Sequence, residues 1–388
     1  DLPTAKVNME SAISQGQQRV DIIVTDPPYY DAIPYSDLMD FFYIWMRRAL
    51  FGISPEIDLA FSSALGPKWN SSKNDGELID DAGRFSGNKE ASKRNYEEGM
   101  ARAFRTCRNS LLDNGRLVIV FAHKQPDAWE TLVSAIIQAG FVVDASWPIQ
   151  TEMGNRTRAL AAAALSSSVW LVCKKRPETA RPGWDNRVLE EMRSRIHERL
   201  RDFWDADIRG PDFVWAATGP AMEAYSKHPV VKKANEPGQV MAVSEFLRHV
   251  RRIVVDFVVG RVLTATGGTE AVSSLDDLTT YYLLHRHDFG LEEAPAGACI
   301  LYAVSCGLSD RDLVDSYDLL LRSGSKSATD EVEDTAESEE EDAEESGSGS
   351  GSKLKLKAWE HRRRKGMGLD AEGRPAPLID QVHKLMHL

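Results

Sequence analysis

The residues with the clearest chemical potential are Asp26-Pro27-Pro28-Tyr29, which directly follow the apolar run VDIIVT at residues 20–25. A carboxylate can accept one N–H of an amine, and the carbonyl of Pro27, whose direction the restricted proline backbone fixes, can accept the other. Two such acceptors turn the lone pair of the nitrogen toward an electrophile, and an adjacent aromatic ring can stack on a planar base. The tetrad therefore predicts a site that positions a weak nucleophile without a covalent intermediate.

Secondary-structure signals place this tetrad at the end of a buried strand. Sites in open α/β sheets form beyond the carboxyl ends of the strands. Besides the strand at 20–25, strands are predicted at 116–122, 141–149 and 167–175, and helices at 35–52, 96–115 and 128–140. This alternation predicts an α/β fold with an open, doubly wound sheet, which leaves room for an antiparallel pair at its end.

The half of the chain after residue 176 predicts a different architecture. Its apolar periodicities indicate helices, at 187–204, 241–263, 275–286 and 309–322. Ser309 at the start of the last one, with Asp312 three residues later, forms a capping-box pattern. Residues 177–325 are therefore predicted to form an all-α domain.

The remaining segments are strongly charged. Residues 326–352 predict a disordered linker, since an acidic tract is followed there by SGSGSGS. Residues 330–345 hold eleven acids and no base, and without them the net charge of −12 would be −1. Residues 353–388 hold nine Lys and Arg against four acids, and predict a basic segment with a short helix at 377–388. Overall charge therefore neither supports nor excludes DNA binding.

Composition bounds the class of protein. No apolar run reaches the roughly 18 residues that a membrane span needs, and the start DLPTAKVNME has neither a basic region nor an apolar core, so no signal peptide is visible. No pair among the four cysteines has CxxC spacing, which makes a metal site or a disulfide framework a weak expectation. A reduced, cytoplasmic protein is the default.

The tetrad resembles motif IV of the amino-methylating DNA methyltransferases, in which Asp, Asn or Ser precedes Pro-Pro and an aromatic residue. These enzymes use S-adenosylmethionine as methyl donor. The resemblance implies that Asp26 and the Pro27 carbonyl grip the exocyclic amine of adenine or cytosine, that Pro28 completes the motif and that Tyr29 stacks on the base. It also implies that residues 1–176 are the catalytic half of a Rossmann-like, class I methyltransferase domain.

A wider resemblance covers most of the chain. DPPYYDAIPYSDLMDFFYIWMRR, LLDNGRLVIVFAHK, WETLVSAIIQAGF with SWPI, and PLIDQVHKLMHL are similar to large prokaryotic adenine-specific DNA methylases. This favours adenine as the target, and such methylases near phage-defence genes imply restriction-modification or phage defence as one expectation. Some of them carry a zinc ribbon, but no cysteine pairing here could make one, so no metal is expected.

Other functions stay open at this point. Methylation of the cytosine amine would use the same tetrad. Methylation of RNA or of a protein amide would need the same two acceptors for N–H groups. A non-catalytic DNA-binding or assembly subunit is a further alternative, favoured by the lack of a Gly-rich loop after a strand.

The donor side of the site is incomplete in the sequence. The family's Gly-rich S-adenosylmethionine motif is not visible, so the chain resembles a C-terminal portion whose donor site an N-terminal segment or a partner chain completes. Asn8, Glu10 and Ser11 stand where cofactor contacts are expected; an ordinary strand and turn is the alternative.

Further candidates surround the tetrad. Tyr30, Asp31 and Tyr35 are predicted walls of the substrate site, although Tyr35 also suits a core. His123 and Lys124 follow the second strand and are predicted to contact the base or a phosphate, with a solvated strand end as the alternative.

Two basic or amide-rich stretches are candidates for nucleic-acid contacts. The insertion at 53–95 is the candidate target-recognition segment, with a disordered loop as the alternative; its contact residues would be Lys68, Trp69, Asn70, Lys73 and Asn74. The cluster at 362–365 is a candidate phosphate contact, with a solvated cluster as the alternative.

Overall fold

The computed structural model describes residues 11–14, 19–31, 33–62, 69–70, 75–123, 125–150, 167–265, 275–322, 353–363, 367 and 375–388. They fall into two compact units. Unit one holds the described residues up to Ile149, Ser168–Arg201 and Trp215–Val250; unit two holds Asp202–Val214 and the described residues from Arg251 onward. The expected boundary at residue 176 does not coincide with this division, because the segment after it packs with the sheet of unit one.

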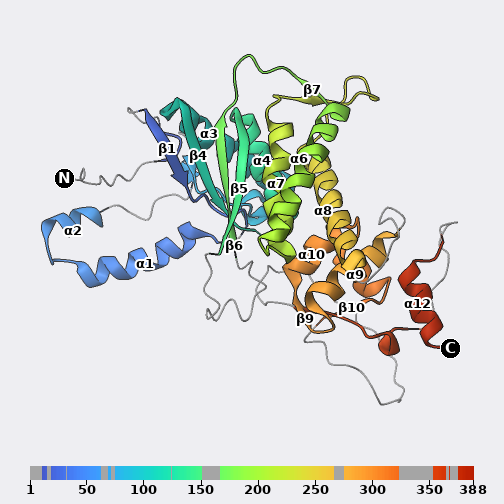
Figure 1. Cartoon of the computed structure of the whole chain (residues 1–388). Helices are drawn as coiled ribbons and strands as arrows, with labels where there is room; N and C mark the ends of the chain where they lie inside the picture. Colours follow the sequence, from blue (N-terminus) through green and yellow to red (C-terminus); the bar gives the residue numbers. More distant parts are fainter. Residues whose placement is uncertain are drawn as a thin grey trace, which may run out of the picture. The chain divides into compact units, whose positions relative to one another are not determined.

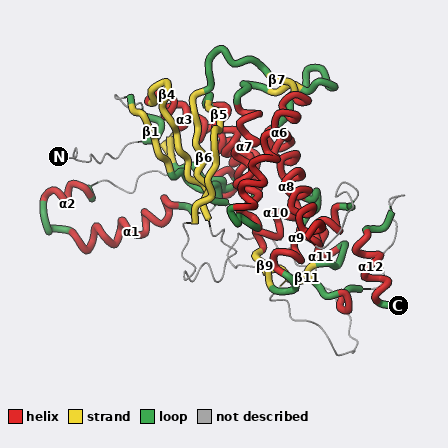
Figure 2. Tube along the Cα trace, in the orientation of Figure 1, coloured by secondary structure: helices red, strands yellow, loops and turns green. Residues whose placement is uncertain are grey.

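Unit one is built on a mixed four-stranded sheet (Figures 1 and 2). Its strands lie in the order β1 (Val20–Thr25), β4 (Leu111–Phe121), β6 (Ser167–Lys175) and β5 (Phe141–Gln150). β1 runs parallel to β4, and β6 runs antiparallel to β4. The four predicted strands and the α/β class are thus confirmed, with the antiparallel strand inside the sheet.

The helices and short strands of unit one complete this architecture. They are α1 (Tyr35–Leu50), α2 (Pro55–Ala60), β2 (Trp69–Asn70), β3 (Asp75–Gly76), the 3-10 helix η1 (Ala82–Phe85), α3 (Lys89–Ser110), α4 (Pro126–Gln138), β7 (Gly183–Trp184) and β8 (Val231–Lys232). Helices α6 (Asp185–Asp205), α7 (Gly210–Ser226) and α8 (Val243–Ala265) have residues in both units. The segment 53–95, predicted as an insertion, thus contains α2, β2, β3, η1 and the start of α3.

The core of unit one lies on one face of the sheet. Leu117, Ile119 and Phe121 alternate along β4 and are fully buried, and they pair across the sheet with buried residues of β6. The ring of Phe121 meets that of Trp129 on α4 edge-to-face, with 5.0 Å between the centroids. Each such fully buried apolar side chain contributes about 1.5–3 kcal/mol to folding.

Helix α3 begins and ends earlier than predicted. It starts at Lys89 because Asn88 caps it, its side-chain oxygen accepting from the Ala91 N–H at 3.0 Å. It ends at Ser110, and the Asn114-Gly115 pair, read as a helix stop, lies inside β4. A Cβ at Gly115 would come 2.8 Å from the Asp21 carbonyl, so glycine permits the close approach of β1 at its irregular register there.

The two edges of this sheet differ. At the β5 edge, α7 supplies hydrogen-bond partners: Ser226 Oγ accepts from the Val143 N–H at 2.9 Å, and Ser146 Oγ donates to the Ala216 carbonyl at 2.8 Å. At the β1 edge, Ile22 and Val24 are 62% and 60% exposed, so the strand exists but the expectation that it is buried is wrong. Among the described strands, β4 alone pairs with β1.

Residues 177–325 are not all-α, and that expectation is wrong, because β7, β8 and two strands of unit two come from this range. The helices of unit two are α9 (Asp277–Phe289), α10 (Ala296–Ser305), α11 (Asp310–Asp315), the 3-10 helix η3 (Trp359–His361) and α12 (Leu378–Met386). They accompany a three-stranded antiparallel sheet in the order β10 (Leu320–Arg322), β11 (Lys353–Leu356), β9 (Glu293–Pro295). β11 comes from the segment predicted as a separate basic tail.

The helix predicted at 309–322 is only one and a half turns long. Ser309 is its N-cap as predicted, since its Oγ accepts from the Asp312 N–H at 3.0 Å and donates to Asp312 Oδ2 at 2.7 Å. The chain then turns at Asp318, which has a φ of 51° and pairs with Lys357, and continues as β10. The apolar residues after Asp315 therefore pack as a strand, which helical periodicity could not reveal.

Arg362 is a structural residue, and neither of the two readings of its basic cluster applies to it. Its side chain is fully buried and donates to Asp380 Oδ1 and to the Tyr317 carbonyl, both at 2.7 Å. Its Nη1 lies 2.9 Å from His383 Nδ1. Because Asp380 and His383 belong to α12, this guanidinium ties the C-terminal helix to the rest of unit two.

We expect unit two to lose stability in mild acid. Burial lowers the pKa of His285 to about 4, and burial together with the neighbouring Arg362 and His387 lowers that of His383 to about 4. Between pH 6.5 and 4 the unfolded chain thus binds more protons than the folded one, so the unfolding free energy falls as pH falls, by up to about 3 kcal/mol per histidine. Denaturant titrations at pH 7.5 and 5.0 measure this change. His285→Leu should reduce the slope of the unfolding free energy against pH by the equivalent of about one proton. An unchanged slope in this variant would contradict the role given to His285.

Candidate functional site

The predicted tetrad leaves β1 at the carboxyl end of the strand, next to the carboxyl end of the parallel strand β4. Asp26 is exposed, and Pro27, Pro28 and Tyr29 are half-buried. The ring of Tyr29 meets that of Phe121, the last residue of β4, with 5.4 Å between the centroids. The structure therefore confirms the predicted position of the tetrad at the sheet edge where sites form.

A cavity of about 610 Å³ opens beside the tetrad. The end of β1, residues 11–13, residues 75–78 and one face of α3 form its walls. Ser11, expected on the donor side, and Asp26, Pro27, Pro28 and Tyr35, expected on the amine side, all line it. The structure thus brings together residues from both predicted halves of the site.

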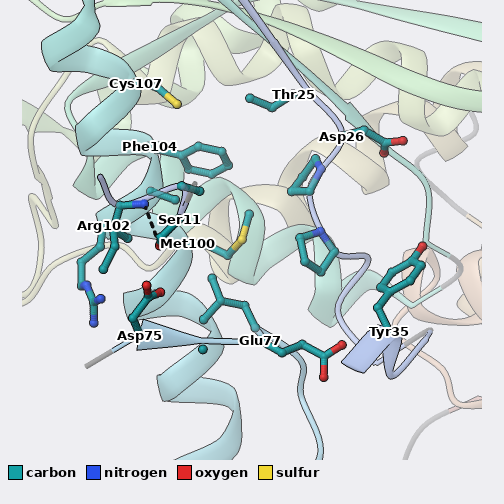
Figure 3. Close-up of a pocket in the computed structure, with 18 residues that line it drawn as sticks. Ser11, Thr25, Asp26, Tyr35, Asp75, Glu77, Met100, Arg102, Phe104 and Cys107 are labelled. Carbon is teal, nitrogen blue, oxygen red and sulfur yellow. Dashed lines mark hydrogen bonds between the residues drawn. The ribbon is translucent and has the colours of Figure 1, made fainter. Parts of the chain in front are cut away.

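The cavity is apolar in the middle and charged at its ends. In Figure 3, Met100 and Phe104 lie between Asp26 and Tyr35 on one side and Arg102 on the other. The carboxylate of Asp26 points to the side of Tyr35, away from Phe104 (Figure 3). The Asp26 carboxylate therefore does not point into the apolar middle of the cavity.

Glu77 anchors the charged wall near Tyr35. It accepts from the Ser36 N–H at 2.8 Å and pairs with Arg84 at 2.8 Å. Burial opposes ionisation of Glu77, but the hydrogen bonds from Ser36 and Arg84 outweigh it and hold the pKa of the carboxyl below its usual value. A charged Glu77 thus fixes the beginning of α1 against the cavity wall.

Tyr96 of α3 holds the backbone of the tetrad. Its hydroxyl donates to the Pro28 carbonyl at 2.6 Å and accepts from the Tyr30 N–H at 3.2 Å. Burial raises the pKa of this hydroxyl, which keeps it protonated as a donor. Pro28 is thus restrained from the α3 side, and Asp26 and Pro27 are held in place on the cavity wall.

Tyr30 lies in the core and not on the cavity wall where it was predicted. Its φ is 54°, a left-handed conformation that costs a bulky residue about 1–3 kcal/mol. Its ring packs edge-to-face on Tyr96 and His123, and its carbonyl accepts from the Asp80 N–H at 3.1 Å. Tyr30 therefore acts as the anchor of the turn after the tetrad.

His123 is also part of this support. Its Nδ1 accepts from the Gln125 N–H at 3.1 Å, so the ring proton sits on Nε2, which donates to Asp31 Oδ1 at 2.8 Å. The side chain is only 5% exposed and does not line the cavity. His123 therefore holds Asp31 in place and is not positioned for the predicted contact with a base or a phosphate.

Several predicted residues lie outside the described part of the chain: Asn8, Glu10, Lys68, Lys73, Asn74 and Lys124. Trp69 and Asn70 form β2, which pairs with β3. The sequence reasoning missed the contributions of Asp75, Glu77 and Arg102 to the cavity. Met100, Phe104 and Cys107, from the predicted helix at 96–115, also line the cavity.

Comparison with models of known protein families, with curated proteins and with solved structures finds no match to this chain. Among the described helices, none is both long and apolar enough to cross a membrane. The described residues also contain no group of three or more His, Cys, Asp or Glu side chains placed to hold a metal ion.

Proposed function

We propose that this chain is the amine-binding part of an S-adenosylmethionine-dependent DNA methyltransferase that modifies the exocyclic amine of adenine. The observation that carries the proposal is the tetrad itself: Tyr96 restrains Pro28, and Asp26 and Pro27 line a cavity of about 610 Å³. A carboxylate and a carbonyl on one rigid corner match the two hydrogens of an exocyclic amine.

The fold supports this proposal. We propose that the sheet of unit one is the second half of a Rossmann-like sheet, because α3 lies in the chain between the parallel strands β1 and β4. The site stands at the carboxyl ends of these strands, where ligands of such sheets bind. DNA as partner and a cytoplasmic location follow from the same proposal.

The cavity residues fit the methyl donor. S-adenosylmethionine, when bound, supplies an electrophilic methyl group on a positively charged sulfur. Ser11 and Arg102 could bind its amino-acid part, and Met100 and Phe104 offer apolar surface to its nucleoside. The volume lies within the 300–1,000 Å³ or so that small-molecule sites occupy.

The residues of the tetrad then divide the work. Asp26 and the Pro27 carbonyl accept the two amine hydrogens, which directs the nitrogen lone pair toward the cavity. The Asp26 carboxylate would stabilise the positive charge that develops on the amine nitrogen and would accept the proton that this nitrogen loses. Tyr29, half-buried against Phe121, offers a ring on which the base can stack.

Two measurements test this function. Calorimetric titration with S-adenosylmethionine measures donor binding, and mass spectrometry of nucleosides from treated duplex DNA measures the product. N6-methyldeoxyadenosine that depends on the chain is the expected result. If the product is cytosine methylated on its amine, the target base is cytosine. If RNA is methylated and DNA is not, the substrate is RNA. If the chain binds the donor but no methylated product forms, the chain is a non-catalytic subunit.

A further inference from the structure

Helix α1 stands clear of the sheet of unit one (Figure 1) and buries none of its residues. Its apolar side chains are nevertheless large. The exposed fractions are 48% for Leu38, 61% for Met39, 58% for Phe41, 58% for Phe42, 57% for Trp45 and 48% for Met46. Contiguous apolar surface of this kind marks an interaction site in soluble proteins.

The exposed residues of α1 form a regular seam. Tyr35, Leu38, Phe42, Trp45 and Ala49 follow one another at spacings of three, four, three and four residues, and all five are exposed. This is the spacing by which one α-helix packs along another. The seam is thus shaped for a second helix lying along α1.

The start of α1 is fixed, so the seam is presented in one orientation. The backbone N–H and the hydroxyl of Ser36 both donate to Glu77, and Arg84 bridges Glu77 and Asp37. Beyond Ser36 the helix contacts α2 through Tyr43, whose ring lies 5.3 Å from that of Phe61. The seam itself stays uncovered by the described residues.

The charges of α1 identify the helix that fits. Acidic residues gather near its first turn, where Asp37, Glu77 and Asp81 all pair with Arg84. Arg47 and Arg48 occupy its last turn. A copy of α1 in antiparallel orientation would place each acidic end beside a basic end, whereas a parallel copy would place like charges together.

We propose that α1 is a dimer interface, and that it pairs antiparallel with α1 of a second copy of this chain about a two-fold axis near Phe42. Such isologous pairing is the commonest way in which identical chains associate. Half-exposed side chains of this size leave roughly 100 Å² each, so the seam and its flanks offer roughly 700 Å² per chain, near the roughly 800 Å² per partner of a standard interface. The inference does not depend on methyl transfer.

The pairing also bears on the candidate site. Tyr35 and Glu77 line both the 610 Å³ cavity and a groove along α1 that includes Leu38, Met39 and Phe42. A second α1 seated on this groove would contact Tyr35 and Glu77 at the margin of the cavity. Donor binding is therefore measured separately from dimer formation, by calorimetry.

Sedimentation equilibrium of the whole chain tests the proposal. The wild-type chain should be a dimer, and Trp45→Glu should weaken it about 30-fold or more, as expected for a central tryptophan. Trp184→Glu is the matched control, because Trp184 is 48% exposed on β7, and it should leave the dimer unchanged. Because α1 buries no side chain, Trp45→Glu should unfold at the wild-type denaturant concentration.

Charge reversal tests the antiparallel orientation. Arg48→Glu should weaken the dimer, because Arg48 flanks the seam and an antiparallel copy would place it beside the first turn that holds Asp37, whereas Arg47→Glu, on the face opposite the seam, should change it less. A monomeric wild-type chain, or a dimer insensitive to Trp45→Glu, would overturn the proposal. So would a monomer that binds lipid vesicles or duplex DNA through Trp45, which would assign the seam to another partner.

Discussion

Asp26→Ala should abolish methyl transfer while leaving the fold intact. The carboxylate is one of two acceptors that the corner offers to the target amine, and it carries the charge that opposes the developing positive nitrogen. Loss of a single such electrostatic contact lowers kcat by about 100- to 1,000-fold in other enzymes. Because Asp26 is exposed and carries no core packing, its removal should leave unfolding unchanged. The measurement is the rate of N6-methyldeoxyadenosine formation in any preparation in which the wild-type chain is active.

Two variants control this experiment. Asp26→Asn keeps one acceptor oxygen and is expected to retain part of the activity, and the resemblance allows Asn at this position. Asp21→Ala removes an exposed carboxylate from β1, outside the cavity lining, and should be fully active. Full activity of Asp26→Ala would refute the proposed mechanism.

Tyr96→Phe should damage both stability and catalysis. The variant leaves the Pro28 carbonyl without its 2.6 Å hydrogen bond and removes the hydroxyl acceptor of the Tyr30 N–H, in a fully buried position. The Tyr30 N–H keeps its 3.1 Å hydrogen bond to the Pro28 carbonyl, so only the two bonds of the Tyr96 hydroxyl are lost, and we expect a loss of about 1–3 kcal/mol from the unfolding free energy. Denaturant titration followed by tryptophan fluorescence measures this.

The catalytic effect of Tyr96→Phe separates positioning from general loss of structure. At a temperature where the variant is folded, kcat should fall by about tenfold, the effect expected of a slightly misplaced acceptor, while the affinity for S-adenosylmethionine stays the same. Tyr225→Phe is the matched control, because its buried hydroxyl donates to the Met241 carbonyl at 2.6 Å, far from the tetrad in sequence and outside the cavity lining. A Tyr96→Phe variant with unchanged kcat would show that the bond is structural only.

The elements that position the tetrad could be predicted because their signals are local. The four strands of unit one are short apolar runs bounded by turn residues, and the helices at 35–52, 128–140, 187–204, 241–263, 275–286 and 377–388 are confirmed within a few residues. Helix α7 escaped prediction, since Gly219 and Pro220 interrupt its pattern. Gly219 is required there because a Cβ would come 2.2 Å from Ser146 Oγ. That constraint comes from β5, not from the helix.

The support of the site depends on contacts that sequence spacing does not encode. Tyr96 lies 68 residues from the Pro28 carbonyl that it restrains, and His123 lies 92 residues from Asp31. Tyr30 follows the tetrad directly and looked like a site residue, but its left-handed backbone turns the ring into the core. Chemistry could therefore be assigned to the tetrad from its residue types, whereas its anchors became evident only in three dimensions.

The acidic tract has an unexpected topological position. It was predicted to link two bodies, but the chain leaves the sheet of unit two at Arg322 and re-enters it at Lys353, with Arg322 opposite Leu354 in adjacent strands. The ends of the tract are thus held at the spacing of neighbouring strands, about 5 Å. Since loop-closure entropy grows by only about 0.6 kcal/mol per doubling of length, the number of residues in between hardly affects the fold. A protease that cuts the tract would leave two fragments held together by β10, β11 and Arg362, so new chain termini, deletions or whole inserted domains could be accepted there without rebuilding unit two.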